Sequence, residues 1–155
     1  TSVWVHLKEK ETGKEFFFLS THMPVRTNSS YPNEPYIQAR INSANLNVER
    51  MKKIAGESAM CFIVGDMNCS YAADDTRRSA LAPYYAWMQS GREKAPDRDS
   101  AYSYNNFGGG TPSARWNLDH IFYKGVKPVR FQTVTSPNYG VTYLSDHYPI
   151  TLTVE

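Results

Sequence analysis

The sequence lacks a strong charge of either sign, because 17 Lys and Arg residues nearly balance 15 Asp and Glu residues and leave a formal net charge of +2. So weak a charge argues against a protein dedicated to tight nucleic-acid binding, which relies on a basic surface. No apolar run approaches the ~20 residues of a membrane-spanning helix, so no transmembrane segment is expected. The chain opens on Thr1, not on Met, so the lack of a visible leader decides nothing, and secretion and a cytoplasmic location both stay open.

Cysteine is also scarce, with only Cys61 and Cys69 in the chain. A strand rises about 3.3 Å per residue, which separates these two residues by more than the roughly 7 Å that a disulfide spans between Cα atoms. We therefore expect two free thiols. What the sequence does contain is 41% hydrophobic and 14% aromatic residues over 155 positions, which suits one globular domain.

Hydrophobic periodicity predicts a mixed α/β arrangement of about six strands and two helices. An apolar stripe at steps of three and four residues predicts the main helix over 37–55. A second helix is expected within 74–91, restarted at Pro83, and the polar stretch 91–113 is expected to be a long loop. Alternating or continuous apolar residues place strands at 3–8, 15–21, 61–66, 117–123, 128–135 and 148–154.

The segment CFIVGDMN, from Cys61 to Asn68, is the most informative stretch of the chain. Its apolar half is typical of a strand buried on both faces, and Gly65 allows a sharp turn directly afterwards. If strand geometry continues, Asp66 and Asn68 project to one side at the rim of a sheet, where active sites are commonly built. The alternative is a plain turn, since Gly, Asp and Asn all favour turns.

Further polar residues fall at or near the ends of expected strands. His22 follows the second strand, although a lone histidine is more often structural. Asp119 lies in the apolar segment NLDHIFY, where a carboxylate needs a partner, either backbone amides or a histidine that it orients. His120 points the other way and is expected to pack. Asp146 and His147 precede the last strand, either as a capped turn or as a metal-binding carboxylate beside a base.

The order of these motifs, a strand ending in His22, then GDMN, LDHIF and SDHYPI, resembles the endonuclease/exonuclease/phosphatase superfamily. This DNase I-like group contains nucleases, apurinic endonucleases, sphingomyelinases and inositol-polyphosphate phosphatases. The resemblance runs over nearly the whole chain, from TGKEFFFLSTH to LSDHYPITLTVE. It implies a DNase I-like α/β sandwich of two packed sheets. Residues 1–155 would be the C-terminal part, about one half of the domain, with a mixed sheet of roughly six strands and two main helices.

The resemblance further implies a metal-dependent phosphoesterase that hydrolyses a phosphodiester or phosphomonoester by in-line attack of an activated water. Asp66 would position or activate that water, and Asn68 would hold a phosphate oxygen and the nucleophile. His147 would contact the scissile phosphate and serve as general base, with Asp119 fixing its ring. His22 would donate a hydrogen bond to a phosphate oxygen.

Asp146 is implied as a metal-binding carboxylate, with Mg²⁺ as the expected cofactor and Mn²⁺ as the alternative, since Mg²⁺ suits oxygen ligands. The family's principal metal-binding glutamate lies in an N-terminal half that this chain lacks. We therefore expect the chain to be inactive alone, with its exposed sheet packed on the missing half or on a second copy. Two alternatives stay open, a non-catalytic binding or scaffold member of the same fold and an inert fragment.

The substrate itself is a phosphate ester whose organic part stays undetermined, and nucleic acid is not favoured. The loop residues Tyr104, Phe107, Arg115 and Trp116 are expected to receive a small organic phosphate, a lipid head group or a base. The alternative is that the aromatic residues only pack the loop. Arg40 matches an arginine that many members carry on this helix, and a structural ion pair is its expected role.

Overall fold

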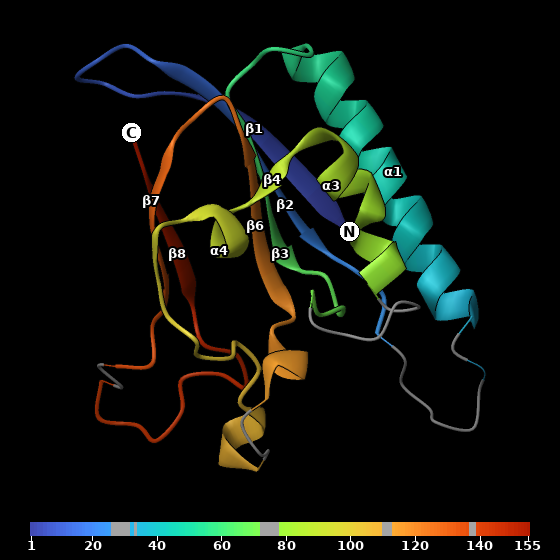
Figure 1. The fold of residues 1–155 in the computed structure, drawn as a ribbon, viewed down its shortest axis with the longest axis vertical. Coiled ribbons are helices and arrows are strands. Elements are labelled where there is room, and N and C mark those ends of the chain that lie inside the picture. Colours follow the sequence, from blue (N-terminus) through green and yellow to red (C-terminus); the bar gives the residue numbers. More distant parts are fainter. Residues whose placement is uncertain (26–31, 33, 72–77, 110–112, 137–138) are drawn as a thin grey trace.

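The structure, a computed structural model, describes residues 1–25, 32, 34–71, 78–109, 113–136 and 139–155. Eight strands, three α-helices and three short 3₁₀ helices occur in these residues (Figure 1). The strands are β1 (Ser2–Lys8), β2 (Glu15–His22), β3 (Cys61–Asp66), β4 (Gln89–Ser90), β5 (Asp97–Arg98), β6 (Asp119–Lys124), β7 (Pro128–Thr133) and β8 (Ile150–Val154). The helices are α1 (Glu34–Ala55), α3 (Ala82–Trp87), α4 (Gly91–Lys94), η1 (Ser79–Leu81), η2 (Asn106–Gly108) and η3 (Ala114–Trp116).

The strands form a five-stranded sheet in the order β1-β2-β3-β6-β4 and a three-stranded sheet in the order β5-β7-β8. Strands β2 and β3 are parallel, whereas β3 and β6 are antiparallel. The carboxyl ends of β2 and β3 therefore meet the amino end of β6 at one end of the sheet. The register there pairs His22 with Asp66 and Asp66 with Asp119, so three polar residues lie side by side.

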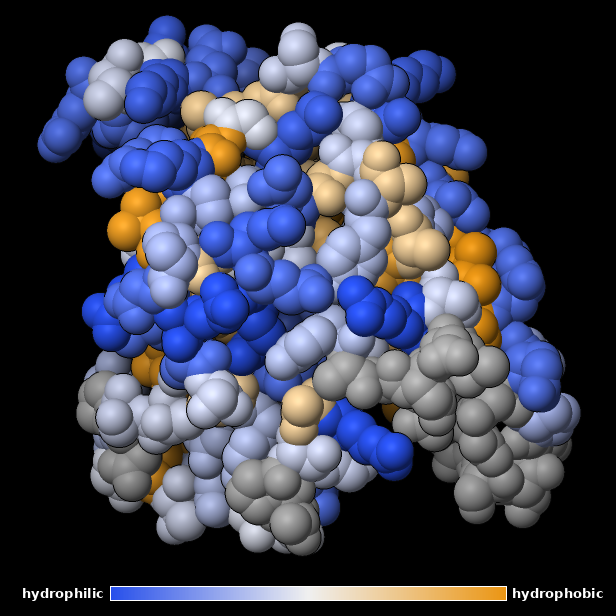
Figure 2. Space-filling view, in the orientation of Figure 1, coloured by the Kyte–Doolittle hydropathy of each residue, from blue (hydrophilic) through white to orange (hydrophobic). Residues whose placement is uncertain are grey.

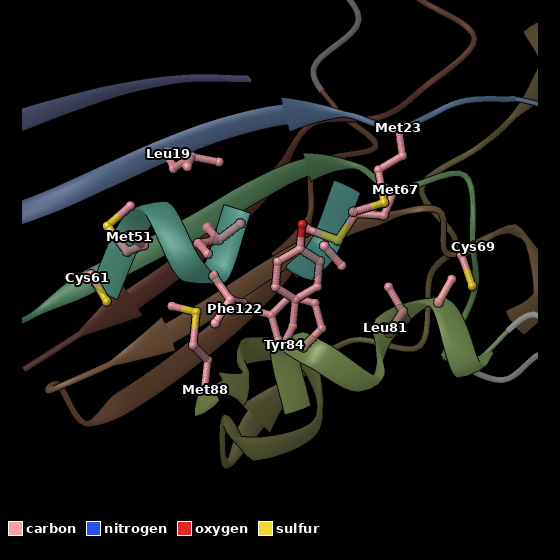
Figure 3. Packing of buried hydrophobic residues seen from close by; sticks show 14 residues of the cluster. Leu19, Met23, Met51, Cys61, Met67, Cys69, Leu81, Tyr84, Met88 and Phe122 are labelled. Atoms are coloured by element: carbon pink, nitrogen blue, oxygen red, sulfur yellow. The ribbon is translucent and has the colours of Figure 1, made fainter. Parts of the chain in front are cut away.

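Helix α1 covers one face of the five-stranded sheet with the apolar stripe that the sequence predicts. Gly56 ends this helix, because its φ of 87° is left-handed and its N–H donates to the carbonyl oxygen of Lys52 at 2.9 Å. On the same side, Tyr84 of α3 stacks on Phe122 of β6 with ring centroids 4.9 Å apart (Figure 3). The buried core between strands and helices includes Leu19, Ala44, Val48, Met51, Ile63 and Phe122.

The opposite face of the five-stranded sheet is open. The cross-strand pairs Phe18–Phe62 and Val64–Ile121 project from this face and are only partly buried. They line a groove of about 710 Å³ together with alternate residues of β8, namely Ile150, Leu152 and Val154. The edge strand β1 extends this open face with three exposed residues, Val3, Val5 and Leu7. In the view of Figure 2, hydrophilic residues predominate and hydrophobic residues form separate patches.

The α/β class is confirmed, but the expectation of one mixed sheet of roughly six strands is wrong. Strands β7 and β8 pair with each other, and β7 also pairs with β5, so these three form a sheet of their own. The chain leaves the first sheet after β6 through Gly125, whose φ is 78°. A Cβ there would stand 3.0 Å from the Cα of Met60, so glycine suits this turn. Alternation along β7 and β8 reveals strands but not the sheet to which they belong.

The segment between β3 and β6 also differs from expectation. Asp74, the expected start of the second helix, lies outside the described residues. Helix α3 has Pro83 in its first turn, as predicted, but it ends at Trp87 before β4. Gly91 begins α4 instead of ending a helix. The Ser90 side chain accepts the N–H of Glu93 and so caps the amino end of α4. The expected loop 91–113 therefore carries α4 and β5.

The expectation for the two cysteines is met. Cys61 and Cys69 are buried thiols that no disulfide joins. Within the part of the chain that the structure describes, no helix has the length and apolar character needed to cross a membrane.

Candidate active site

Gly65 allows β2 and β3 to lie close enough to set His22 beside Asp66. A Cβ on Gly65 would stand 1.8 Å from the carbonyl oxygen of Thr21, and the φ of 137° also requires glycine. Because alternate residues share a face, His22, Asp66 and Asp119 project from the same face as the open groove. Gly65 and Asp119 line the groove itself, so the groove reaches the polar end of the sheet.

Asn68 meets Asp66 through a turn and not through continued strand geometry, which corrects one expectation. Asn68 has a left-handed φ of 49°, and its backbone N–H donates to Asp66 Oδ1 at 2.8 Å. Its side-chain amide donates to the carbonyl oxygen of Met23 at 2.9 Å and lies 3.4 Å from Asp66 Oδ2. The amide therefore ties the Asp66 carboxylate to the segment that follows His22.

His147 joins the polar residues of the sheet from the loop before β8. Its Nδ1 lies 2.6 Å from Asp119 Oδ2, and its Nε2 lies 3.8 Å from Asp66 Oδ2. His22 Nε2 approaches the same Asp66 oxygen at 3.4 Å. A carboxylate only accepts hydrogen bonds, so Asp119 requires a proton on His147 Nδ1 and leaves Nε2 facing the site. The structure thus brings His22, Asp66, Asn68, Asp119 and His147 together.

Burial and charge alter the protonation of two of these groups. The hydrogen bond to Asp119 raises the pKa of His147 above its ordinary value, and the charges of Asp66 and Asp146 act in the same direction, while desolvation opposes them. Burial raises the pKa of Asp66, and the nearby Asp119 adds to this rise. A histidine that stays charged to higher pH can bind an anion, and a carboxylate with a raised pKa is a stronger base. The pair is therefore suited to acid–base work on an anionic substrate.

Two residues that the sequence interpretation missed support this arrangement. Met23 contributes through its main chain, because its carbonyl oxygen accepts the Asn68 side-chain amide and its N–H donates to the carbonyl oxygen of Asp66 at 2.9 Å. Ser103 is fully buried and its hydroxyl accepts the N–H of Asp119 at 3.1 Å. A backbone carbonyl and a single serine inside a polar loop carry no sequence signal, so only the structure reveals them.

Asp146 lies beside His147, but its surroundings do not complete a metal site. Ser145 Oγ donates to Asp146 Oδ1 at 3.2 Å. Among the described residues, no group of three or more His, Cys, Asp or Glu side chains could hold a metal ion. Mg²⁺ requires near-octahedral oxygen coordination, and both Asp66 oxygens already face donors of the site. These residues alone therefore do not fit a complete Mg²⁺ centre.

An aromatic wall flanks His147 on one side. The ring of Tyr104 lies 5.0 Å from the His147 ring and 5.4 Å from the Trp116 ring, measured between centroids. Phe107 is 62% exposed, has a left-handed φ of 50°, and belongs to the same loop. Arg115 precedes Trp116 in η3 and is exposed. Tyr104 thus contacts His147 and Trp116 packs on Tyr104, whereas Phe107 and Arg115 are exposed in the same region.

Two other residues lie in structural positions. His120 is buried, its Nε2 lies 2.7 Å from the Cys69 carbonyl oxygen, and its ring stacks on Phe122. It packs on the helix-covered face, as predicted. Arg40 is buried on α1, where its Nε donates to the carbonyl oxygen of Pro24 at 2.8 Å.

Known proteins are similar to this chain in family and in fold. The model of the endonuclease/exonuclease/phosphatase family matches residues 3–147. No curated protein matches the chain significantly. Among solved structures, an endonuclease/exonuclease/phosphatase from Bacteroides vulgatus is 24% identical with a TM-score of 0.78, over 99% of this chain and 54% of that one.

Two further structures are similar at the level of fold. A mannosyl-6-phosphatase from Bacteroides thetaiotaomicron is 23% identical with a TM-score of 0.76, over 99% of this chain and 56% of its own. A beta toxin variant from Staphylococcus aureus with bound magnesium ions is 17% identical with a TM-score of 0.68, over 99% of this chain and 57% of its own. The chain therefore spans only about half the length of the solved structures that it matches.

Proposed function

The chain belongs to the endonuclease/exonuclease/phosphatase family, and from this premise we propose that the protein it forms part of hydrolyses a phosphate ester. One observation carries the proposal. The Nε2 atoms of His22 and His147 both lie within 4 Å of a single Asp66 oxygen, while Asp119 holds the far side of the His147 ring. Two nitrogen donors on either side of one carboxylate suit a phosphate bound above it, with a water between phosphate and carboxylate.

In the proposed reaction Asp66, and not His147 as the resemblance implies, accepts a proton from this water as the water oxygen attacks phosphorus. The ester oxygen leaves on the opposite side with its bonding electron pair and takes a proton from solvent. His147 in its charged form and His22 donate hydrogen bonds to the phosphoryl oxygens, which gain negative charge during the attack. Asp119 keeps His147 oriented and favours its charged form, because it accepts from Nδ1 at 2.6 Å.

We also assign a divalent cation, Mg²⁺ in the first place, to the complete protein. A magnesium-bound beta toxin among the structural neighbours supports this assignment. Within this chain, Asp146 is the carboxylate that would contribute to the site. Asp66 and Asn68 would be further candidates, the rest of the domain would supply other oxygen ligands, and the cation would neutralise charge on the phosphate.

The same reasoning assigns residues 1–155 to about one half of a two-sheet domain. The open groove beside the site supports this, as does the 54–57% of the neighbours' length that the chain covers. Either the rest of the domain or a second copy of the chain would cover the groove. We assign the organic part of the substrate to the wall formed by Tyr104 and Trp116, with Phe107 and Arg115 further out. A mannosyl-6-phosphatase among the neighbours makes sugar phosphates the first substrates to test.

The test measures hydrolysis of mannose 6-phosphate, a nitrophenyl phosphate and a bis-nitrophenyl phosphate by the complete protein, with Mg²⁺ supplied. Asp66→Asn and His147→Ala should each lower kcat by about 10²–10⁴-fold, since each removes a proton acceptor or a positioning group. Matched controls are Asp97→Asn and His6→Ala, which change exposed residues paired with Arg130 and Glu15 on the surface. Near-full activity of both site variants on every ester would refute the assignment.

A further inference from the structure

Ser103 lies between the two segments that carry Asp119 and His147, and it is fully buried. Its hydroxyl oxygen accepts the N–H groups of Leu118 and Asp119, each at 3.1 Å, and donates to the carbonyl oxygen of Trp116 at 3.3 Å. A serine hydroxyl offers one donor and two acceptor positions, so all three are used. The side chain therefore fixes the backbone where β6 begins.

The main chain around Ser103 holds the segment of His147, the hydrogen-bond partner of Asp119. The carbonyl oxygen of Ser103 accepts the N–H of Tyr148 at 2.7 Å. The next residue, Tyr104, forms an isolated antiparallel bridge with His147. One residue thus binds the Asp119 segment through its hydroxyl and the His147 segment through its carbonyl oxygen.

We propose that Ser103 is a positioning residue that sets the contact between Asp119 and His147. The inference rests on the proposed function, because this contact is what orients the histidine in it. A small shift of either segment would lengthen the 2.6 Å separation between His147 Nδ1 and Asp119 Oδ2. Ser103 acts on substrate only through this pair, since its hydroxyl is saturated by backbone groups.

The test compares Ser103→Ala with Ser90→Ala in the complete protein. Both residues are buried serines, but the Ser90 hydroxyl caps α4 by accepting the N–H of Glu93. Both substitutions should lower the melting temperature. Only Ser103→Ala should lower kcat, by about 10- to 100-fold with KM changed by less than about threefold, because misplacing a catalytic group by about 1 Å can reduce rates by that much.

A spectroscopic measurement makes the test independent of activity. A proton held between His147 Nδ1 and the Asp119 carboxylate at 2.6 Å should give a proton NMR signal downfield of the backbone amides. The signal is assigned by its loss in His147→Ala. It should persist in Ser90→Ala and shift upfield or broaden in Ser103→Ala. If no phosphate ester is hydrolysed, this signal still decides the role of Ser103.

A milder variant covers the case in which Ser103→Ala does not fold. Ser103→Cys retains a weak acceptor at the same position and should give a smaller loss of kcat and a smaller change in the signal. An unchanged downfield signal with unchanged kcat in the folded Ser103 variants would overturn the proposal. A loss of kcat in Ser90→Ala equal to that in Ser103→Ala would also overturn it, because the effect would then follow stability and not position.

Discussion

Asp119→Asn is the sharpest perturbation of the site, because it changes one oxygen to a nitrogen without altering volume. The Asp119 and His147 side chains are only 16% and 23% exposed, so solvent screens their contact weakly. A hydrogen bond to a charged group contributes roughly 1.5–3 kcal/mol to stability, against roughly 0.5–1.5 kcal/mol for a neutral one. The substitution should therefore lower the free energy of unfolding most where His147 is charged.

The sign of the pH dependence follows from the direction of the His147 shift. Asp119 raises the pKa of His147 in the folded state. Stability gained in this way is fully present below the unfolded pKa of about 6.5 and is lost as pH rises through the higher folded value. The loss caused by Asp119→Asn should accordingly be larger at about pH 6 than at about pH 9, by on the order of 1 kcal/mol.

The same substitution should also reduce turnover. An asparagine side chain carries no charge, so it no longer favours the charged form of His147 that donates to the phosphoryl oxygens, and losing such a contribution can lower kcat by about 10²–10⁴-fold. Urea unfolding at about pH 6 and about pH 9 measures the loss of stability, and steady-state kinetics measure the loss of turnover. Asp97→Asn, at an exposed ion pair with Arg130, is the control. A stability loss that is equal at both pH values, or larger at the alkaline one, would refute the reasoning.

Two further predictions concern the scaffold. Gly65→Ala should destabilise the protein by about 3 kcal/mol or more, because the new methyl group would meet the Thr21 carbonyl. Gly56→Ala should cost only about 1 kcal/mol, because a Cβ there meets open space. Thermal unfolding compares the two variants. The 155-residue chain expressed alone should associate through its open groove, which light scattering detects, and a monodisperse monomer would contradict this.

The sequence predicts the helix-covered half of the fold well, for a physical reason. Helix α1 has a strong periodic stripe, and β3 is a short apolar run that ends at Asp66, so local pattern and burial agree. The two-residue strands β4 and β5 have no periodicity to detect. The division into two sheets depends on long-range pairing that alternation does not specify.

For the site, sequence reasoning identifies candidate side chains that the structure brings together, but not the contacts that arrange them. Asp119 is found because a carboxylate in an apolar strand needs a partner, and the structure provides His147. Asn68 is found from strand alternation, but its contact with Asp66 depends on a left-handed turn. Ser103 is not found at all, because one serine in a polar loop gives no pattern.

The open groove and the polar site share one face of the sheet, and this follows from strand geometry alone. In β3, Phe62, Val64 and Asp66 are alternate residues, so the apolar part of the face continues directly into the polar end of the sheet. Helix α1 covers the other face, and on the open face the described residues leave Phe62 and Val64 only partly buried. Whatever packs on Phe62 and Val64 must therefore extend to within a few residues of Asp66. We therefore expect a substitution in the groove to change stability and turnover together.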